Sequence, residues 1–203
     1  MRFQSLRGWV LLVGTALLFC FWVATPAQAH HLLEITGLKP NAFNGFLSGL
    51  AHPVLGPDHL LFLLALALLG LQRRLTWVIG LLVVGLAGSA AGLLWPGLPG
   101  AESLVSLSLV LEALVLLQRA PAPMLVPAMA LHGYVLSNTV LGWSAMPLST
   151  YVLGLLVSQG GLLLLALSLL RKPAANLSGR WRVVCACTLI GLGSAWALGQ
   201  ALG

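Results

Sequence analysis

Long apolar runs separated by short breaks constrain this chain more than any other feature. Of its 203 residues, 59% are hydrophobic and only 7% are charged. The expected spans are 43–71, 75–95, 98–118, 124–143, 146–170 and 181–202. At 1.5 Å per residue, each can cross a hydrocarbon core of about 30 Å. The sequence therefore predicts an all-α, polytopic membrane protein with six transmembrane helices, and a soluble domain would need far more charge.

The first 29 residues have the pattern of a secretory signal peptide. Arg2 and Arg7 precede the apolar stretch 9–23, and Ala27-Gln28-Ala29 is a small-x-small cleavage site. We therefore expect a cleaved signal peptide over residues 1–29, followed by a transmembrane domain over residues 30–203. An uncleaved first helix is the alternative.

Basic residues alternate from one break to the next. The first, third and fifth breaks contain most of the Arg and Lys residues, namely Arg73, Arg74, Arg119, Arg171, Lys172 and Arg180, and the second and fourth contain none. By the positive-inside rule the odd breaks are cytoplasmic, so both mature termini lie outside the inner (plasma) membrane of a bacterium. The formal charge of +6 is spread over these breaks and forms no patch, so the expected partner is the lipid bilayer and not nucleic acid.

Three groups that can bind a metal lie within the first apolar span, at His52, Asp58 and His59. An ionisable group at this depth costs about 2.5–3.5 kcal/mol, which by default marks a functional position. Imidazole and carboxylate are suitable ligands for a divalent transition metal. The alternative is structural: Asp58 caps a helix and both histidines are hydrogen-bonded core residues.

This span is not expected to be one regular helix. On an ideal helix His52 and His59 would lie about 10 Å apart along the axis, which one ion cannot bridge. Pro53, Gly56 and Pro57 supply a break that would draw the two histidines together. Gly-x-x-x-Gly pairs in the first and second spans also predict close packing between helices.

Three further polar residues extend this series through the membrane. Glu102 lies near the level of His52, while His132 and then Glu112 lie deeper, below His59. Each has a structural alternative: Glu102 can be solvated, His132 can be a hydrogen-bonded core histidine, and we favour pairing of Glu112 with Arg119 or Arg73.

At these residues the chain resembles the HupE/UreJ family of bacterial membrane proteins, which is associated with uptake of nickel and, in some members, cobalt. The family motif His-Pro-x-x-Gly-x-Asp-His is complete at residues 52–59, and Glu102 matches an acidic position of the family. The related nickel/cobalt permeases have four residues between the first His and the Asp-His pair, whereas this chain has five, as HupE/UreJ proteins do. The resemblance implies a cleaved signal and six helices.

The fourth span departs from the family pattern. Where the family typically reads His-Gly-x-Ala-His-Gly-x-Glu, this chain keeps His132 and Gly133 but has Leu136 in place of the second His and Thr139 in place of the Glu. Two metal-associated groups that the resemblance implies are therefore missing, and Thr139 and its neighbours would offer only weaker oxygen ligands.

We predict an inner-membrane secondary permease for a divalent transition metal, with nickel or cobalt as the cargo and no permanently bound cofactor. The predicted metal ligands are His52, Asp58, His59, Glu102 and His132. No nucleotide-binding motif is present, so gradients, the membrane potential or another subunit must drive transport. A homo-oligomer and partners in metalloenzyme maturation are both compatible with this function.

Two other functions compete with the permease, which is not expected to be an enzyme. An intramembrane serine hydrolase would use Ser89, in Gly88-Ser89-Ala90, with His132 as its base. A cofactor-binding membrane subunit would hold haem between histidines.

Overall fold

The computed structural model describes residues 39–70, 75–175 and 177–202, and every regular element in these ranges is helical. The predicted signal peptide, residues 1–29, lies outside them. The α-helices are α3 (Ala42–Leu55), α4 (Pro57–Gly70), α5 (Leu75–Leu94), α6 (Ala101–Leu116), α7 (Leu125–Leu136), α8 (Ala145–Ala175) and α9 (Gly179–Leu202). Two 3₁₀ turns flank α7, namely η2 (Ala122–Met124) and η3 (Asn138–Val140).

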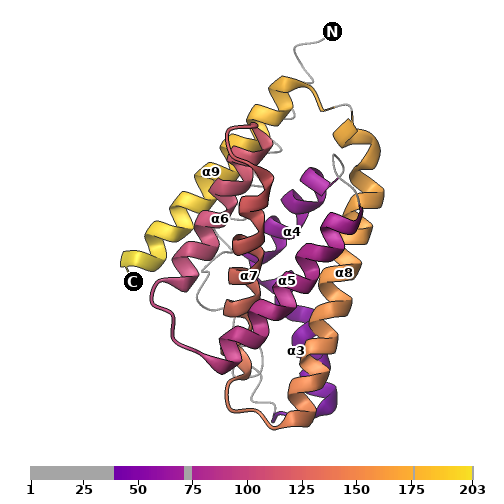
Figure 1. The fold of residues 1–203 in the computed structure, drawn as a ribbon, viewed down its shortest axis with the longest axis vertical. Coiled ribbons are helices and arrows are strands. Elements are labelled where there is room, and N and C mark those ends of the chain that lie inside the picture. Colours follow the sequence, from indigo (N-terminus) through magenta and orange to yellow (C-terminus); the bar gives the residue numbers. More distant parts are fainter. Residues whose placement is uncertain (1–38, 71–74, 176, 203) are drawn as a thin grey trace.

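The helices form a bundle in which α4 occupies the interior (Figure 1). The most extensive contacts join α3 to α8, α5 to α7 and α6 to α9, while α4 packs on α8 and α6. Phe62 and Leu66 of α4 are almost fully buried, as a central helix requires. All three pairings join elements that are distant in the sequence, so the bundle is closed by long-range contacts.

Within the described ranges, only some of the six predicted spans contain a helix that is long and apolar enough to cross a membrane. Helices α5, α8 and α9 are long and apolar enough to cross a membrane, and the bent pair of α3 and α4 passes the same test together. Helix α6 has 16 residues and α7 has 12. The predicted spans 98–118 and 124–143 are therefore too long as single helices, because a left-handed Gly100 precedes α6 and 3₁₀ turns replace both ends of the fourth span.

The predicted break in the first span is confirmed. Helix α3 ends at Leu55, α4 begins at Pro57, and the two helices are bent by 73°. Gly56 between them has an extended backbone, with φ −79° and ψ 105°. A residue that precedes proline is disfavoured in the helical region, whereas proline itself is favoured at the first helical position. The local sequence thus ends one helix and begins the next at this point.

Glycines let the paired helices approach closely, as predicted from their spacing. A Cβ on Gly88 would collide with the carbonyl oxygen of Ala130, and a Cβ on Gly133 would collide with that of Gly85. Helices α5 and α7 therefore pack backbone against backbone. Gly49 has the same role between α3 and α8, where the carbonyl oxygen of Tyr151 fills the space of its missing Cβ.

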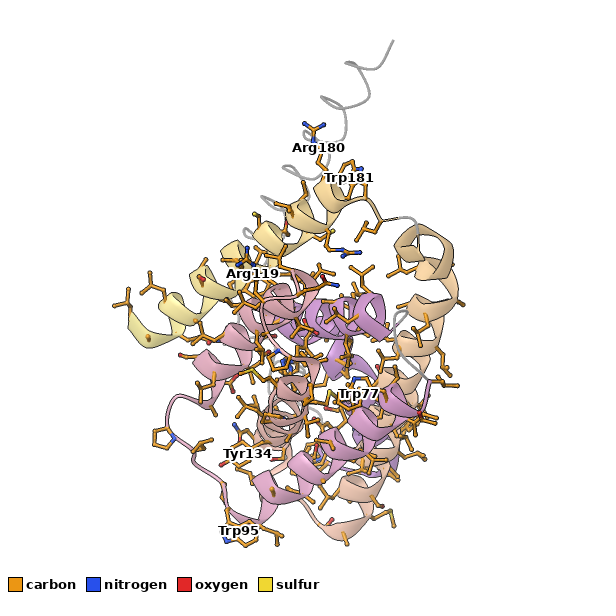
Figure 2. The ribbon with its side chains drawn as sticks, turned by 45° about the horizontal axis from the view of Figure 1, so that its top comes forward. Trp77, Trp95, Arg119, Tyr134, Arg180 and Trp181 are labelled. Atoms are coloured by element: carbon orange, nitrogen blue, oxygen red, sulfur yellow. The ribbon has the colours of Figure 1, made fainter. Side chains whose placement is uncertain are left out.

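The described basic residues of the breaks gather at one end of the bundle. Figure 2 places Arg119, Arg180 and Trp181 toward one end and Trp95 at the other. Tyr134 lies toward the Trp95 end and donates its hydroxyl hydrogen to the Trp95 carbonyl oxygen, at 2.7 Å (Figure 2). This distribution matches the predicted alternation of charge between the breaks, and aromatic side chains near both ends are typical of membrane proteins.

Candidate functional site

The break between α3 and α4 brings two histidines close together. His52 lies in the last turn of α3 and His59 in the first turns of α4, and both are buried, with 5% and 2% exposed. Their ring centroids are 5.8 Å apart and the ring planes differ by 16°, so the imidazoles stack. The bend therefore closes the gap of about 10 Å that a continuous helix would leave between them.

Asp58 is buried beside this pair, with 1% exposed. Its Oδ1 atom accepts a hydrogen bond from the backbone N–H of His59, at 2.9 Å, and lies 3.6 Å from His59 Nδ1. Its Oδ2 atom is buried and has no hydrogen-bond partner in the described part of the chain. Because α4 begins at Pro57, Asp58 lies inside the first turn and is not the helix cap that the structural alternative supposed. Its Oδ1 atom still satisfies one N–H group of the first turn, whereas the buried Oδ2 atom is not explained by capping.

His132 joins the site from α7. Its Nδ1 atom lies 3.2 Å from Nδ1 of His59, and its Nε2 atom lies 2.7 Å from the hydroxyl oxygen of Ser108 on α6. The ring of Phe62 stacks on His132, with centroids 3.9 Å apart. His132 is 3% exposed. Helices α4, α6 and α7 thus meet around one buried imidazole.

Tyr151 of α8 holds the other end of the site. Its hydroxyl lies 3.0 Å from His52 Nδ1, 2.7 Å from the Leu136 carbonyl oxygen and 3.3 Å from Thr139 Oγ1. Sequence reasoning missed both Tyr151 and Ser108. The signal for each was only a polar atom in an apolar span, which does not reveal its partner. The result is a continuous polar series, Tyr151, His52, His59, His132 and Ser108, from five different helices.

The geometry of the two central histidines suits a shared cation as well as a hydrogen bond. Two nitrogens about 2.0–2.1 Å from one metal, at angles of about 90–110°, lie about 2.9–3.4 Å apart. The Nδ1 atoms of His59 and His132 are 3.2 Å apart. Among the described residues, no three His, Cys, Asp or Glu side chains are already arranged to hold a metal ion. Ligation by a third group would therefore require side-chain rotation.

Comparison with known proteins identifies the family. The family model described as HupE / UreJ protein matches residues 17–197. The chain belongs to the HupE/UreJ family. That family is associated with nickel and cobalt transport, and neither a curated protein nor a solved structure matches the chain. The family assignment confirms the resemblance inferred from residues 52–59.

In this HupE/UreJ protein, both departures from the second family motif lie beside Tyr151, since Leu136 packs with Tyr151 in one buried cluster and Thr139 Oγ1 lies 3.3 Å from its hydroxyl. Leu136, which replaces the second histidine, supplies the carbonyl oxygen that Tyr151 contacts, and Thr139, which replaces the glutamate, contacts the same hydroxyl. Both altered positions are therefore neighbours of a tyrosine from α8, which also contacts His52.

The two glutamates of α6 differ in their relation to the site. Glu102 lies partly buried in the first turn, six residues or about 9 Å along the axis from Ser108. It is turned about 240° around the helix from Ser108, so the structure does not bring it beside His132. Glu112 lies one turn beyond Ser108 and on the same face, and it is fully buried.

The expected ion pair of Glu112 with Arg119 is wrong. Arg119 is exposed in the turn that follows α6, and neither carboxylate oxygen of Glu112 has a hydrogen-bond partner in the described ranges. Arg73, the other expected partner, lies outside the described residues. Because α6 ends at Leu116, Arg119 is carried out of the helix and away from the face that buries Glu112.

The residues proposed for a serine hydrolase do not pair. The Ser89 hydroxyl donates to the carbonyl oxygen of Gly133, at 2.9 Å, with a longer contact of 3.3 Å to that of Gly85. His132 contacts Ser108 instead. The histidine rings also contact one another, with centroids 5.8 Å and 5.0 Å apart, whereas a haem held between two histidines separates their rings by its macrocycle. The observed geometry favours neither rival.

Proposed function

We propose that this protein is a secondary permease that carries Ni²⁺ or Co²⁺ through the bacterial inner membrane, with the ion as cargo and not as a resident cofactor. The observation that supports it most is the contact of His59 with His132, at 3.2 Å, beside the buried Asp58 carboxylate. These side chains come from two helices that are distant in the sequence. Membership of the HupE/UreJ family supports the same conclusion.

We propose that the chain crosses the membrane six times. The bent pair of α3 and α4 forms the first crossing, and α5, α8 and α9 form three more. Helix α6, with 16 residues, spans about 24 Å, and the segment 122–140 spans about 29 Å if its 3₁₀ turns are included. Both approach the thickness of the hydrocarbon core. The end with Arg119 and Arg180 then faces the cytoplasm, and the mature termini lie outside.

A broken helix inside the membrane suits ion binding. Non-helical backbone at this depth is tolerated where protein buries it or where it lines a cavity, and transporters commonly place their sites at such breaks. Here the break places His52 and His59 against each other with Asp58 alongside. We propose that His52, Asp58, His59 and His132 hold the ion in transit and that Glu102 lies at the outer entrance.

The donor set restricts the cargo by chemistry. Imidazole nitrogens and a carboxylate suit Ni²⁺ and Co²⁺, whereas affinity alone would favour Cu²⁺. Selectivity for nickel or cobalt must therefore come from geometry, which the packed helices around His132 constrain. A gradient or the membrane potential would supply the energy.

Uptake of radioactive Ni²⁺ and Co²⁺ into cells that produce the protein tests this function. We expect His59→Ala and Asp58→Asn to lower uptake at least about tenfold, because the first removes a ligand nitrogen and the second removes the carboxylate charge. Their abundance in the membrane should stay close to that of the parent. Ser89→Ala is the matched control, because it removes a buried hydroxyl that contacts Gly133 and not the histidines. The permease function is wrong if the parent takes up neither ion or if His59→Ala transports normally.

A further inference from the structure

The hydroxyl of Tyr151 has more polar neighbours than it has protons. It is buried and lies near His52 Nδ1, the Leu136 carbonyl oxygen and Thr139 Oγ1. A phenol has one hydrogen to donate. The carbonyl oxygen can only accept, and at 2.7 Å it is the closest of the three, so the Tyr151 hydrogen is directed to Leu136. The Tyr151 oxygen must then accept from His52.

This direction assigns the tautomer of His52. If Nδ1 donates to Tyr151, a neutral His52 carries its proton on Nδ1 and its lone pair on Nε2. Histidines that bind metals commonly donate their second ring N–H to an oxygen, which fixes both the tautomer and the ring orientation. Tyr151 is placed to be that oxygen for His52.

His132 and Ser108 repeat this arrangement at the opposite end of the site. The Ser108 hydroxyl donates to the carbonyl oxygen of Val105 on its own helix, at 2.6 Å. Its oxygen must therefore accept from Nε2 of His132, which leaves the lone pair of His132 on Nδ1, toward His59. Each end of the series is thus anchored by a hydroxyl whose hydrogen is engaged by a backbone carbonyl.

Tyr151 also contacts the two positions at which this chain departs from its family. The Leu136 side chain packs with Tyr151 in one buried cluster and the Thr139 hydroxyl meets the phenol, at the two positions where the family motif has a histidine and a glutamate. Those groups could themselves accept or donate hydrogen bonds beside His52. In this chain the Tyr151 hydroxyl lies 3.0 Å from His52 Nδ1.

We infer that Tyr151 is a positioning residue of the metal site, whose hydroxyl holds His52 as the Nδ1–H tautomer and so presents Nε2 as the ligand nitrogen. The inference rests on the proposed function, in which His52 binds the ion. It assigns α8 a part in the site, although α8 carries none of the family motifs. The tyrosine ring itself packs edge-on against His52 and Trp143.

Tyr151→Phe tests the inference, because it keeps the ring and removes only the hydroxyl. The matched control is Tyr134→Phe, since the chain has two tyrosines and the Tyr134 hydroxyl contacts Trp95 and Leu98 instead of histidine. In purified protein titrated with Co²⁺ and followed by its absorption bands, we expect Tyr151→Phe to weaken binding about 10-fold to 100-fold. Tyr134→Phe should bind Co²⁺ like the parent.

A second measurement needs no metal. Nitrogen-15 NMR of histidine-labelled protein, with the His52 signals identified by their loss in His52→Ala, should show the Nδ1–H tautomer in the parent. Tyr151→Phe should convert part of this population to the Nε2–H tautomer. Unchanged Co²⁺ binding together with an unchanged tautomer in Tyr151→Phe would overturn the inference. Absence of metal uptake by the parent would instead refute the permease function, and the tautomer result would still decide whether Tyr151 orients His52.

Discussion

The Nδ1 atoms of His59 and His132 lie 3.2 Å apart, although 73 residues separate them in the chain. One belongs to the complete family motif of the first span, and the other belongs to the altered motif of the fourth. With three spans in each half, these histidines would come from the first span of each half. Sites built at the interface of two halves are common among secondary transporters.

This contact predicts that the two histidines act on one ion. In Co²⁺ titrations of purified protein, His59→Ala and His132→Ala should each weaken binding strongly. The double variant should be little worse than either single variant, because residues that share a ligand are not additive. If the two losses add, the histidines belong to separate sites. Ser89→Ala serves again as the buried polar control.

The close approach of α5 and α7 predicts which glycines tolerate a methyl group. Gly133→Ala should lower the thermal unfolding midpoint in detergent, because its Cβ would meet the carbonyl oxygen of Gly85. Gly80→Ala, on α5 with nothing within 4 Å of an added Cβ, should be neutral or slightly stabilising. Equal behaviour of the two variants would contradict the packing of α5 on α7.

Glu112 should limit the stability of the bundle. A buried carboxyl with no hydrogen-bond partner costs about 1–3 kcal/mol, and neither oxygen of Glu112 has one among the described residues. Glu112→Leu should therefore raise the unfolding midpoint, whereas Glu112→Gln, which keeps a buried polar group, should change it little. A lower midpoint for Glu112→Leu would show that the carboxyl has a stabilising partner.

The orientation of the bundle has its own test. A reporter that is active only in the periplasm, fused after Gly203, should be active if both mature termini lie outside. The same reporter placed after Arg119 should be inactive, because that break belongs to the basic end of the bundle. Activity in the reverse pattern would invert the proposed topology.

Local features of the sequence were sufficient to predict some of this structure. The break at Gly56 follows from the proline beside it, and the burial of His52 and Asp58 follows from their apolar surroundings. The lengths of α6 and α7 were overestimated from the apolar runs, because hydropathy does not indicate where a glycine or a 3₁₀ turn ends a helix.

Contacts between helices could not be predicted from the sequence. Ser108 and Tyr151 complete the site from α6 and α8, yet no spacing along the chain relates them to the histidines. The pairing of Ser89 with His132 failed for the same reason. Ser89 faces α7 but meets the backbone of Gly133 instead of the neighbouring imidazole, and only the register of α5 on α7 decides between the two.

The altered motif of the fourth span allows the most direct test of the site. Leu136→His with Thr139→Glu restores the family groups at two positions next to Tyr151, whose hydroxyl contacts His52. Two added ligands should tighten Co²⁺ binding or change the preference between Ni²⁺ and Co²⁺. They should also make Tyr151→Phe less harmful, because His52 gains other polar neighbours. Val135→His is the matched control, since Val135 is buried on the same helix but packs with Ala101 and Val105. If the restored protein and the control bind both ions like the parent, positions 136 and 139 lie outside the ion path.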